Sequence, residues 1–574
     1  MKKFLIAVSL LSTTFFPQTA SAATNGEGGL TFVATTDVHG NLMPYNFITR
    51  KPATGSLARV AAYVDSLREA RGAENVVLVD VGDLLQGQPT VYYYNYIDTV
   101  SPHIAPRVMK SMGYDALALG NHDVETGHAV YDRFRTQLGR LPLLAANAVD
   151  TRTGEPYFQP YTVIERGGKR IALLGLITPA IPAWLPENLW EGIRFDDMVE
   201  SAAKWVPYIR ETEKPDMLVG LFHAGHDASR HVGEWIENAS VLVADSVPGF
   251  DLIFIGHDHQ VYNSRRPNGT VVLNGANLAD NVAVATVNFA PGGVEVEGEI
   301  VPMASVQPSQ KFMQEFQGDY DTVKNFVDEQ ITVATGDFRE RDAFFGPSAF
   351  MELLHNLQLR IAGADISLAA PLSFDAVIAE GPVRMADMFT LYKYENLLYT
   401  LRMTGQEIKD YLEMSYDLWT RQMEQPSDEL IRFSKGTHAK GDYAALEHPS
   451  YNFDSAAGIN YEVDVTKPRG EKIRIISMAD GSAFSPDSTY LVAVNSYRAN
   501  GGGDLLTQGA GISKEEMPQR LVKATDRDLR FYLIEQLRAT PSISPEVTQN
   551  WRFVPEEFTT VAIPRDYDRL FPKK

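Results

Sequence analysis

The chain has 574 residues, of which 44% are hydrophobic and 22% are charged. This length and composition predict a folded protein with two large domains, and they exclude a mostly disordered or fibrous chain. Asp and Glu total 73 against 52 Lys and Arg, a formal net charge of −21, so the surface as a whole repels polyanions such as nucleic-acid polymers.

Cysteine is absent, which excludes disulfides, thiolate metal ligands and a lipid-modified N-terminal cysteine. The first residues predict an export signal: Lys2 and Lys3 precede the apolar run Phe4 to Leu11, and the residues up to Ala22 have the pattern of a cleavage site. The apolar run is far shorter than the roughly 20 residues that span a bilayer, and no later segment of the sequence reaches that length. We therefore expect a periplasmic or secreted protein, cleaved near Ala22 and without a membrane anchor.

From Leu30 to about Pro302, short apolar runs alternate with helical stretches, which predicts an α/β domain. Each of five apolar runs is followed by polar residues of the types that bind metals. These runs, interpreted as buried strands, are Leu30 to Thr36, Asn75 to Val81, Ala116 to Leu119, Met217 to Phe222 and Leu252 to Ile255. Loops at the carboxyl ends of strands in an open α/β sheet can aim distant side chains at one point, so we expect the five segments to converge.

Seven residues of metal-ligand type follow these strands: Asp37, His39, Asp83, Asn121, His223, His257 and His259. Each motif alone is weak, because a histidine after a strand is more often structural, but their joint occurrence favours a metal site. Oxygen and imidazole ligands without thiolate suit Mn, Zn, Co or Mg. Seven groups exceed what one tetrahedral zinc uses, and an aspartate can bridge two ions. We therefore predict a centre with two divalent ions, suited to phosphate ester hydrolysis.

His122 follows Asn121 directly in the sequence. We expect its side chain to point past the ligands toward a leaving group, where a protonated imidazole donates a proton. A nearby carboxylate would orient the ring, and both Glu125 and Asp123 are candidates. For Glu125, an acid at the start of a solvated helix is an equally good interpretation.

Beyond Pro302, apolar residues at spacings of three and four from Phe312 predict an amphipathic helix to about Val333, which connects two domains. A polar insertion is expected from about Gln425 to Ser450. The predicted helices and strands of the second domain are Ser348 to Ile361, Thr404 to Trp419, Tyr461 to Val465 and Tyr490 to Asn495. The predicted divisions are a signal at 1–22, a catalytic domain at 28–305, a linker helix at 306–334 and a substrate-binding domain at 335–574.

These segments, in this order, resemble the calcineurin-like metallophosphoesterases, specifically the exported 5′-nucleotidase family with a second, substrate-binding domain. The resemblance covers essentially the whole chain after the signal. It implies a β-sandwich flanked by helices (αββα), joined by a helix to an α/β nucleotide-binding domain. It also implies two ligand sets that share Asp83: Asp37, His39, Asp83 and His259 for one ion, and Asp83, Asn121, His223 and His257 for the other. The family's catalytic histidine falls on His122, and its partner aspartate falls on Glu125, which has a longer side chain.

The second half resembles the family's nucleotide-binding domain, which clamps the base between two aromatic rings. The segments 451–454 and 496–504 occupy the two places where those rings normally lie. The residues expected to bind the nucleotide are Phe453, with Tyr451 as its competitor, Tyr497, Asn500 and Asp504. The glycines at 501–503 are expected to let the backbone approach a ligand.

One departure from the family indicates a branch. Typical 5′-nucleotidases carry an Asn-Gly-Gly-x-Arg stretch whose arginine meets a substrate phosphate, whereas residues 367–372 here read Ser-Leu-Ala-Ala-Pro-Leu. This replacement, with segments 392–396 and 451–454, resembles the periplasmic branch that opens 2′,3′-cyclic nucleotides and then removes the 3′-phosphate. We expect this activity, on nucleotides, from a monomer. The alternatives are a 5′-nucleotidase or UDP-sugar diphosphatase, a thiosulfate-ester hydrolase, and a non-catalytic nucleotide-binding protein, which would lack at least one ligand.

Overall fold

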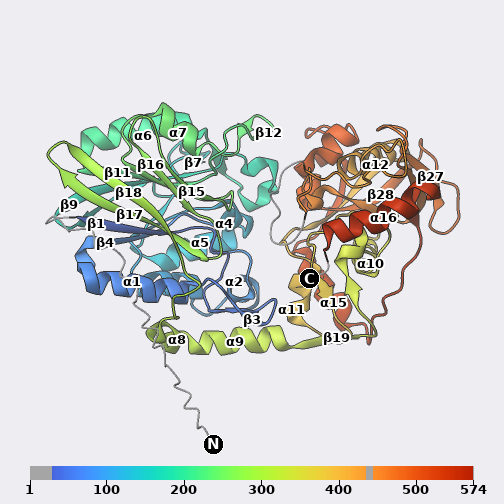
Figure 1. Ribbon diagram of the computed structural model, residues 1–574, viewed down its shortest axis with the longest axis horizontal. Coiled ribbons are helices and arrows are strands. Elements are labelled where there is room, and N and C mark those ends of the chain that lie inside the picture. Colours follow the sequence, from blue (N-terminus) through green and yellow to red (C-terminus); the bar gives the residue numbers. More distant parts are fainter. Residues whose placement is uncertain (1–28, 435–443, 573–574) are drawn as a thin grey trace, which may run out of the picture.

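The computed structural model describes residues 29–434 and 444–572. The predicted signal, Met1 to Ala22, and part of the predicted insertion lie outside the described residues. Two domains lie side by side and are bridged along one edge by a helical segment (Figure 1). Within the described part of the chain, no helix is both long and apolar enough to cross a bilayer.

The N-terminal domain contains two six-stranded sheets that pack face to face (Figure 1). The first sheet has the order β18 (Gly293–Pro302), β17 (Asn281–Ala290), β1 (Leu30–Thr35), β4 (Val76–Asp80), β5 (Ala116–Ala118) and β6 (Leu143–Leu144). The second has the order β15 (Val261–Arg265), β16 (Val271–Gly275), β14 (Leu252–Ile255), β11 (Met217–His223), β9 (Lys169–Ile177) and β8 (Tyr161–Arg166).

Helices cover the outer faces of both sheets. On β1, Phe32 packs between the sheets and the next residue, Val33, packs outward among the helices, as the two-residue period of a strand requires. The covering helices are α1 (Leu57–Arg71), α3 (Ile104–Met112) and α5 (His128–Leu138) on the first sheet, and α6 (Met198–Thr212) and α7 (Ser240–Ser246) on the second. Burial on both faces explains why the central strands read as continuous apolar runs. The predicted αββα sandwich is confirmed.

The five predicted strands are all present, but they belong to two sheets rather than one. The strands β1, β4 and β5 are parallel neighbours in the first sheet, and β11 and β14 are parallel neighbours in the second. The expected convergence therefore occurs across the sandwich.

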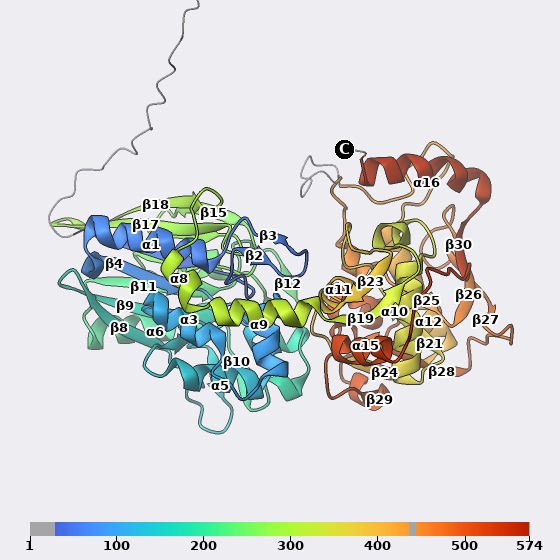
Figure 2. The same ribbon diagram turned by 90° about the horizontal axis from the view of Figure 1, so that it is seen from below.

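The connector between the domains is shorter than the predicted helix. It consists of α8 (Gln310–Glu315) and α9 (Gln317–Asp328), and Figure 2 shows α9 spanning the space between the domains. Glu329 leaves the helical conformation with φ −56° and ψ 125°, and the chain continues as β19 (Gln330–Ala334). The prediction of a helix to Val333 is wrong for this last part, because β19 pairs with β23 (Gly381–Arg384) of the C-terminal domain.

The C-terminal domain has its own core around two smaller sheets. One sheet has the order β25 (Ser455–Ala457), β21 (Ile366–Ala369), β28 (Thr489–Asn495), β24 (Leu398–Thr404) and β29 (Leu521–Ala524), and the other has β27 (Ile473–Met478), β26 (Ile459–Asp464) and β30 (Trp551–Val554). Its main helices are α10 (Ala349–Ala362), α11 (Met385–Leu391), α12 (Gly405–Trp419), α15 (Leu529–Arg538) and α16 (Glu556–Leu570). The predicted helices and strands of this domain lie within about two residues of α10, α12, β26 and β28.

Glu340 makes the stability of this domain depend on pH. Its side chain is 1% exposed, and burial raises its pKa from the usual 4.5 to about 8, although the N–H groups of Leu372 and Ser373 partly oppose the shift. The folded state therefore keeps a proton that the unfolded chain releases. This contribution to stability is complete below pH 4.5 and is lost as pH rises toward 8, by up to about 1.4 kcal/mol per pH unit.

We expect Glu340→Gln to flatten the decline in the free energy of unfolding between pH 5 and 8, as measured by denaturant titration at several pH values. The exposed Glu380→Gln is the control and should leave the decline unchanged. Equal slopes in the Glu340 variant and the unsubstituted protein would contradict the assignment.

Candidate metal centre

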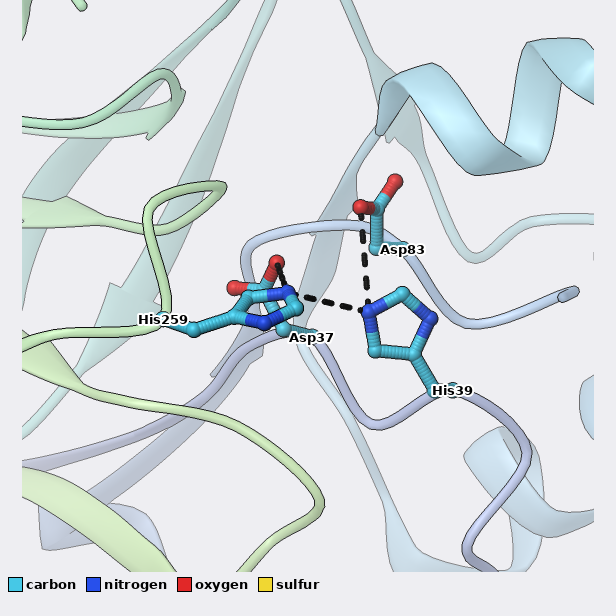
Figure 3. Close-up of side chains that lie close together, drawn as sticks. All are labelled: Asp37, His39, Asp83 and His259. Carbon is cyan, nitrogen blue, oxygen red and sulfur yellow. Dashed lines mark hydrogen bonds and ion pairs between the residues drawn. The ribbon is translucent and has the colours of Figure 1, made fainter. Parts of the chain in front are cut away.

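Four predicted ligands from three strand ends meet in one cluster. Asp37 and His39 follow β1, Asp83 follows β4 and His259 follows β14. Figure 3 shows the four side chains close together. One donor atom of each lies within 4.8 Å of the others. The Nε2 atom of His259 lies 3.1 Å from Nε2 of His39 and 3.2 Å from Oδ1 of Asp37.

A second cluster shares Asp83 and adds three residues, among them His223 at the end of β11. Donor atoms of Asp83, His223 and His257 lie within 4.8 Å of one another. The Oδ1 atom of Asn121 lies 3.1 Å from Nε2 of His223 and 2.8 Å from Nδ1 of His257. The structure thus brings all seven predicted ligand residues into two adjoining groups.

Hydrogen bonds on the far side of three imidazoles orient them for metal binding. In His39 and His223, Nδ1 lies 3.1 and 2.7 Å from the carbonyl oxygens of Gln86 and Val81. A carbonyl only accepts, so each Nδ1 carries a proton and Nε2 is the nitrogen that faces the cluster, where it can bind a cation in place of its own proton. In His257 the arrangement is reversed, because Nε2 donates to the carboxylate of Glu237 at 2.9 Å and Nδ1 faces Asn121.

The electrostatics of the cluster also fit divalent cations. Among the described residues, none donates a hydrogen bond to the buried Oδ2 atom of Asp83, and Nε2 of His223 lies 3.1 Å from it. A buried carboxylate oxygen left without a partner is costly, and a cation would satisfy it. Burial alone would lower the pKa of His223, but Asp83 and Asp37 outweigh it and raise that pKa to about 10. The site therefore has a strong affinity for positive charge.

The backbone is strained to hold these side chains. Five of the seven predicted ligands have positive φ, namely Asp37 at 49°, His39 at 49°, Asp83 at 57°, His257 at 74° and His259 at 55°. Such conformations cost about 1–3 kcal/mol each and gather at functional sites. Gly120 allows the loops to approach closely, since a Cβ there would lie 2.2 Å from the backbone nitrogen of Asp83.

His122 and Glu125 form a pair beside the cluster. Nδ1 of His122 lies 2.5 Å from Oε2 of Glu125. Asp123 is unavailable for this role, because its carboxylate accepts the N–H groups of Asp83, Leu84, Leu85 and Gly120. Burial alone would lower the pKa of His122, but the carboxylates of Asp83 and Glu125 raise it to about 9. The imidazole is therefore charged near neutral pH and able to donate a proton.

A cavity of about 210 Å³ lies between the two domains and opens onto this pair. His122, Glu125 and His257 line it from the N-terminal domain, and Tyr451 and Tyr497 line it from the C-terminal domain. The two tyrosine rings meet edge to face, with centroids 6.2 Å apart and an angle of 87° between their planes. The two rings are therefore not parallel, as they would have to be to stack on both faces of a base.

The other expected nucleotide-binding residues lie elsewhere. Phe453 is fully buried in the C-terminal core, where its ring stacks on Trp419 at 5.4 Å, so the prediction that it faces the nucleotide is wrong. Burying a large aromatic ring in the core is lower in free energy than leaving it exposed to solvent. Of the described residues that line the cavity, none is Asn500 or Asp504. The Asn500 amide donates to the carbonyl of Ser496 at 2.8 Å, and Asp504 accepts from Thr507.

Several further residues of the cavity wall were not identified from the sequence, among them Trp184, Arg230 and Tyr394. Trp184 stacks on His257 with ring centroids 5.5 Å apart, and Arg230 places Nε 2.6 Å from the carboxylate of Glu237. Neither stands in a recognisable motif. Tyr394 does lie in a segment singled out for its resemblance to the cyclic-nucleotide branch, and that signal could have identified it.

Comparisons with known proteins agree with this architecture. Residues 30–261 match the family described as calcineurin-like phosphoesterase, and residues 329–508 match the family described as 5′-nucleotidase, C-terminal domain. A 2′,3′-cyclic-nucleotide 2′-phosphodiesterase/3′-nucleotidase of Yersinia enterocolitica is 25% identical over 627 residues, covering 96% of this chain and 92% of the relative.

Two further comparisons differ in what they cover. The trifunctional nucleotide phosphoesterase protein YfkN of Bacillus subtilis is 27% identical over 614 residues, which cover 93% of this chain but only 39% of that protein. The crystal structure of a putative 5′-nucleotidase from Staphylococcus aureus has a TM-score of 0.75 at 20% identity, covering 92% of this chain and 99% of the other, and it supports the fold alone. The chain therefore belongs to the calcineurin-like metallophosphoesterases that carry a 5′-nucleotidase C-terminal domain.

Proposed function

We propose that the protein opens 2′,3′-cyclic nucleotides to 3′-nucleotides and then cleaves these to nucleoside and phosphate. The observation that carries the proposal is the gathering of seven ligand side chains beside a cavity that holds both His122 and tyrosines of the other domain. The printed name of the Yersinia enterocolitica relative describes the same pair of activities.

In this proposal the two clusters hold two divalent ions, for which Mn, Zn, Co and Mg match the donor set. Asp37, His39, Asp83 and His259 hold one ion, and Asp83, Asn121, His223 and His257 hold the other. When bound, the ions neutralise charge on the phosphate and make water in the site a better nucleophile. Glu237 and the carbonyls of Gln86 and Val81 keep the imidazoles in the required tautomers.

His122 acts as the general acid in both steps. It donates its proton to the 2′ oxygen as the cyclic diester opens, and to the 3′ oxygen as the monoester is cleaved. Glu125 orients the ring through the 2.5 Å contact to Nδ1, which leaves Nε2 as the donor. Both residues line the cavity, so a bound ester can reach them.

The cavity wall favours the cyclic-nucleotide branch over a 5′-nucleotidase. Leu372, from the segment where typical 5′-nucleotidases carry their phosphate-binding arginine, lines the cavity and offers no charge to a 5′-phosphate. Tyr394, Tyr451 and Tyr497 offer aromatic faces and edges to the base, which any nucleobase can contact. We place this activity in the periplasm or outside the cell, on the pattern of the residues up to Ala22.

Rates on four substrates test the proposal. Purified protein supplied with Mn²⁺, Zn²⁺, Co²⁺ or Mg²⁺ is assayed on 2′,3′-cyclic AMP, 3′-AMP, 5′-AMP and UDP-glucose. We expect kcat/KM to be highest for the first two, with 3′-AMP appearing transiently during turnover of the cyclic substrate. A clear preference for 5′-AMP or UDP-glucose would reject the proposed branch. Binding of less than one metal equivalent per chain, together with no turnover, would favour the non-catalytic alternative.

A further inference from the structure

Two separate loops of the C-terminal domain carry the tyrosines of the cavity. Tyr451 belongs to the 3₁₀ turn η6 (Ser450–Asn452), and Tyr497 belongs to the short helix α13 (Ser496–Ala499). Loops of this kind are mobile unless side chains hold them. Arg498 follows Tyr497 in α13; it is 2% exposed and is not among the described residues that line the cavity.

The guanidinium of Arg498 binds both loops at once. Its Nη2 and Nε donate to the two carboxylate oxygens of Asp454 at 2.8 and 3.1 Å. Its Nη1 donates to Oδ1 of Asn452 at 2.9 Å and to the carbonyl of Gly502 at 3.0 Å, and Nη2 also donates to the carbonyl of Tyr451. All three guanidinium nitrogens therefore donate hydrogen bonds, and one of their acceptors is the backbone carbonyl of a cavity tyrosine.

The glycines that follow Arg498 serve the same arrangement. A Cβ at Gly502 would lie 2.4 Å from Cε2 of Tyr497, so the ring of that tyrosine rests on this glycine. A Cβ at Gly503 would lie 2.3 Å from Oδ1 of Asn452 and 2.4 Å from Nη1 of Arg498. These glycines allow protein side chains, rather than a ligand, to approach the backbone.

A buried ion pair is a poor source of stability, because desolvating two charges offsets most of their attraction. The pair instead fixes geometry, because the planar guanidinium of arginine binds both oxygens of a carboxylate in a defined relative orientation. Asp454 is 1% exposed and also accepts the hydroxyl of Tyr411, so the pair is anchored to helix α12. Helix α12 therefore helps to hold the two loops in place, in addition to the bonds between the loops themselves.

We infer that Arg498 is a positioning residue for nucleotide binding: with Asp454 it sets Tyr451 and Tyr497 in the cavity wall. The inference rests on the proposed function, because it assumes that the base of a nucleotide occupies this cavity. It predicts that weakening the pair raises KM for nucleotides while leaving hydrolysis of a phosphate ester without a base unchanged.

The test compares Arg498→Met, Arg498→Lys, Asp454→Asn and Gly502→Ala with the unsubstituted protein on 2′,3′-cyclic AMP, 3′-AMP and glycerol 2-phosphate. We expect KM for both nucleotides to rise about tenfold or more, the equivalent of one lost base–aromatic contact, with kcat changed less than about threefold. The values of kcat/KM for glycerol 2-phosphate should stay the same. Lysine keeps the charge without the fork, so Arg498→Lys should fold but not restore KM.

The matched control is Asp566→Asn. Asp566 is another fully buried carboxylate of this domain; it accepts the N–H groups of Leu430 and Ile431 and is not among the described residues that line the cavity. It should lower the thermal midpoint without changing KM. If Arg498→Met does not fold, Arg498→Lys and Gly502→Ala decide the question. Unchanged nucleotide KM in these variants, or equal losses on all three substrates, would overturn the inference. If the unsubstituted protein cleaves glycerol 2-phosphate as well as 3′-AMP, the proposed function fails instead.

Discussion

Replacing Asp83 with alanine is expected to remove both bound metal ions and to reduce hydrolysis to background. Asp83 is the residue that the two ligand clusters share. Its Oδ2 atom faces His223 and His39 at 3.1 and 4.0 Å, and its Oδ1 atom accepts the backbone N–H of His122 at 2.8 Å. The substitution therefore removes a ligand from each cluster and also frees the loop that carries His122, the proposed general acid.

The measurement is metal content per chain by elemental analysis, alongside turnover of 2′,3′-cyclic AMP. Asp251→Ala is a suitable control, because this carboxylate lies in the second sheet, where it accepts the N–H of Leu218 and pairs with Arg210 at the opposite end of β11 from His223. It should cost stability but retain two metal equivalents. An Asp83→Ala protein that still binds two equivalents would refute the bridging role.

Replacing His122 with alanine is expected to leave metal content unchanged and to lower kcat by on the order of 10² to 10⁴. Its ring lies outside both ligand clusters, and its side chain is 26% exposed toward the cavity. We expect kcat to fall because the variant lacks the imidazole that Glu125 orients and that is proposed to donate the proton. Glu125→Gln should give a smaller loss in the same direction, since the ring keeps a hydrogen-bonding partner but loses the charge beside it.

His128→Ala provides a matched control for this variant. His128 also pairs with a carboxylate on its own helix, Asp132 at 2.9 Å, but it lies outside both clusters and does not line the cavity. Its removal should leave kcat and metal content as they were. Loss of metal from the His122 variant would show that this histidine is a ligand rather than the acid.

Much of the fold and of the metal centre is predictable from local sequence pattern. A buried strand shows itself as an apolar run, and the polar residues after it show where the strand ends, so β1, β4, β5, β11 and β14 could be placed within about two residues. The residue types at these ends define a centre of oxygen and imidazole donors. That information is local, because the period of a strand and the chemistry of the next few residues do not depend on the rest of the chain.

Contacts between residues from different segments cannot be predicted from the local sequence in this way. The apolar runs do not say which sheet a strand joins, and only the packed structure shows two sheets meeting across the metal centre. Residue type allowed both Asp123 and Glu125 as partners of His122, and the resemblance favoured Glu125. The structure shows Asp123 bonded to backbone N–H groups and Glu125 beside Nδ1 of His122.

The same is true of the cavity wall in the C-terminal half. Phe453 and Tyr451 are two residues apart in one motif, yet the first lies in the core and the second in the cavity wall. Composition and spacing by themselves predicted the two-domain class and the donor set, and they proposed His122 as the proton donor. Tertiary structure alone showed the pocket lining and the Arg498–Asp454 pair, because these depend on close packing between segments far apart in the chain.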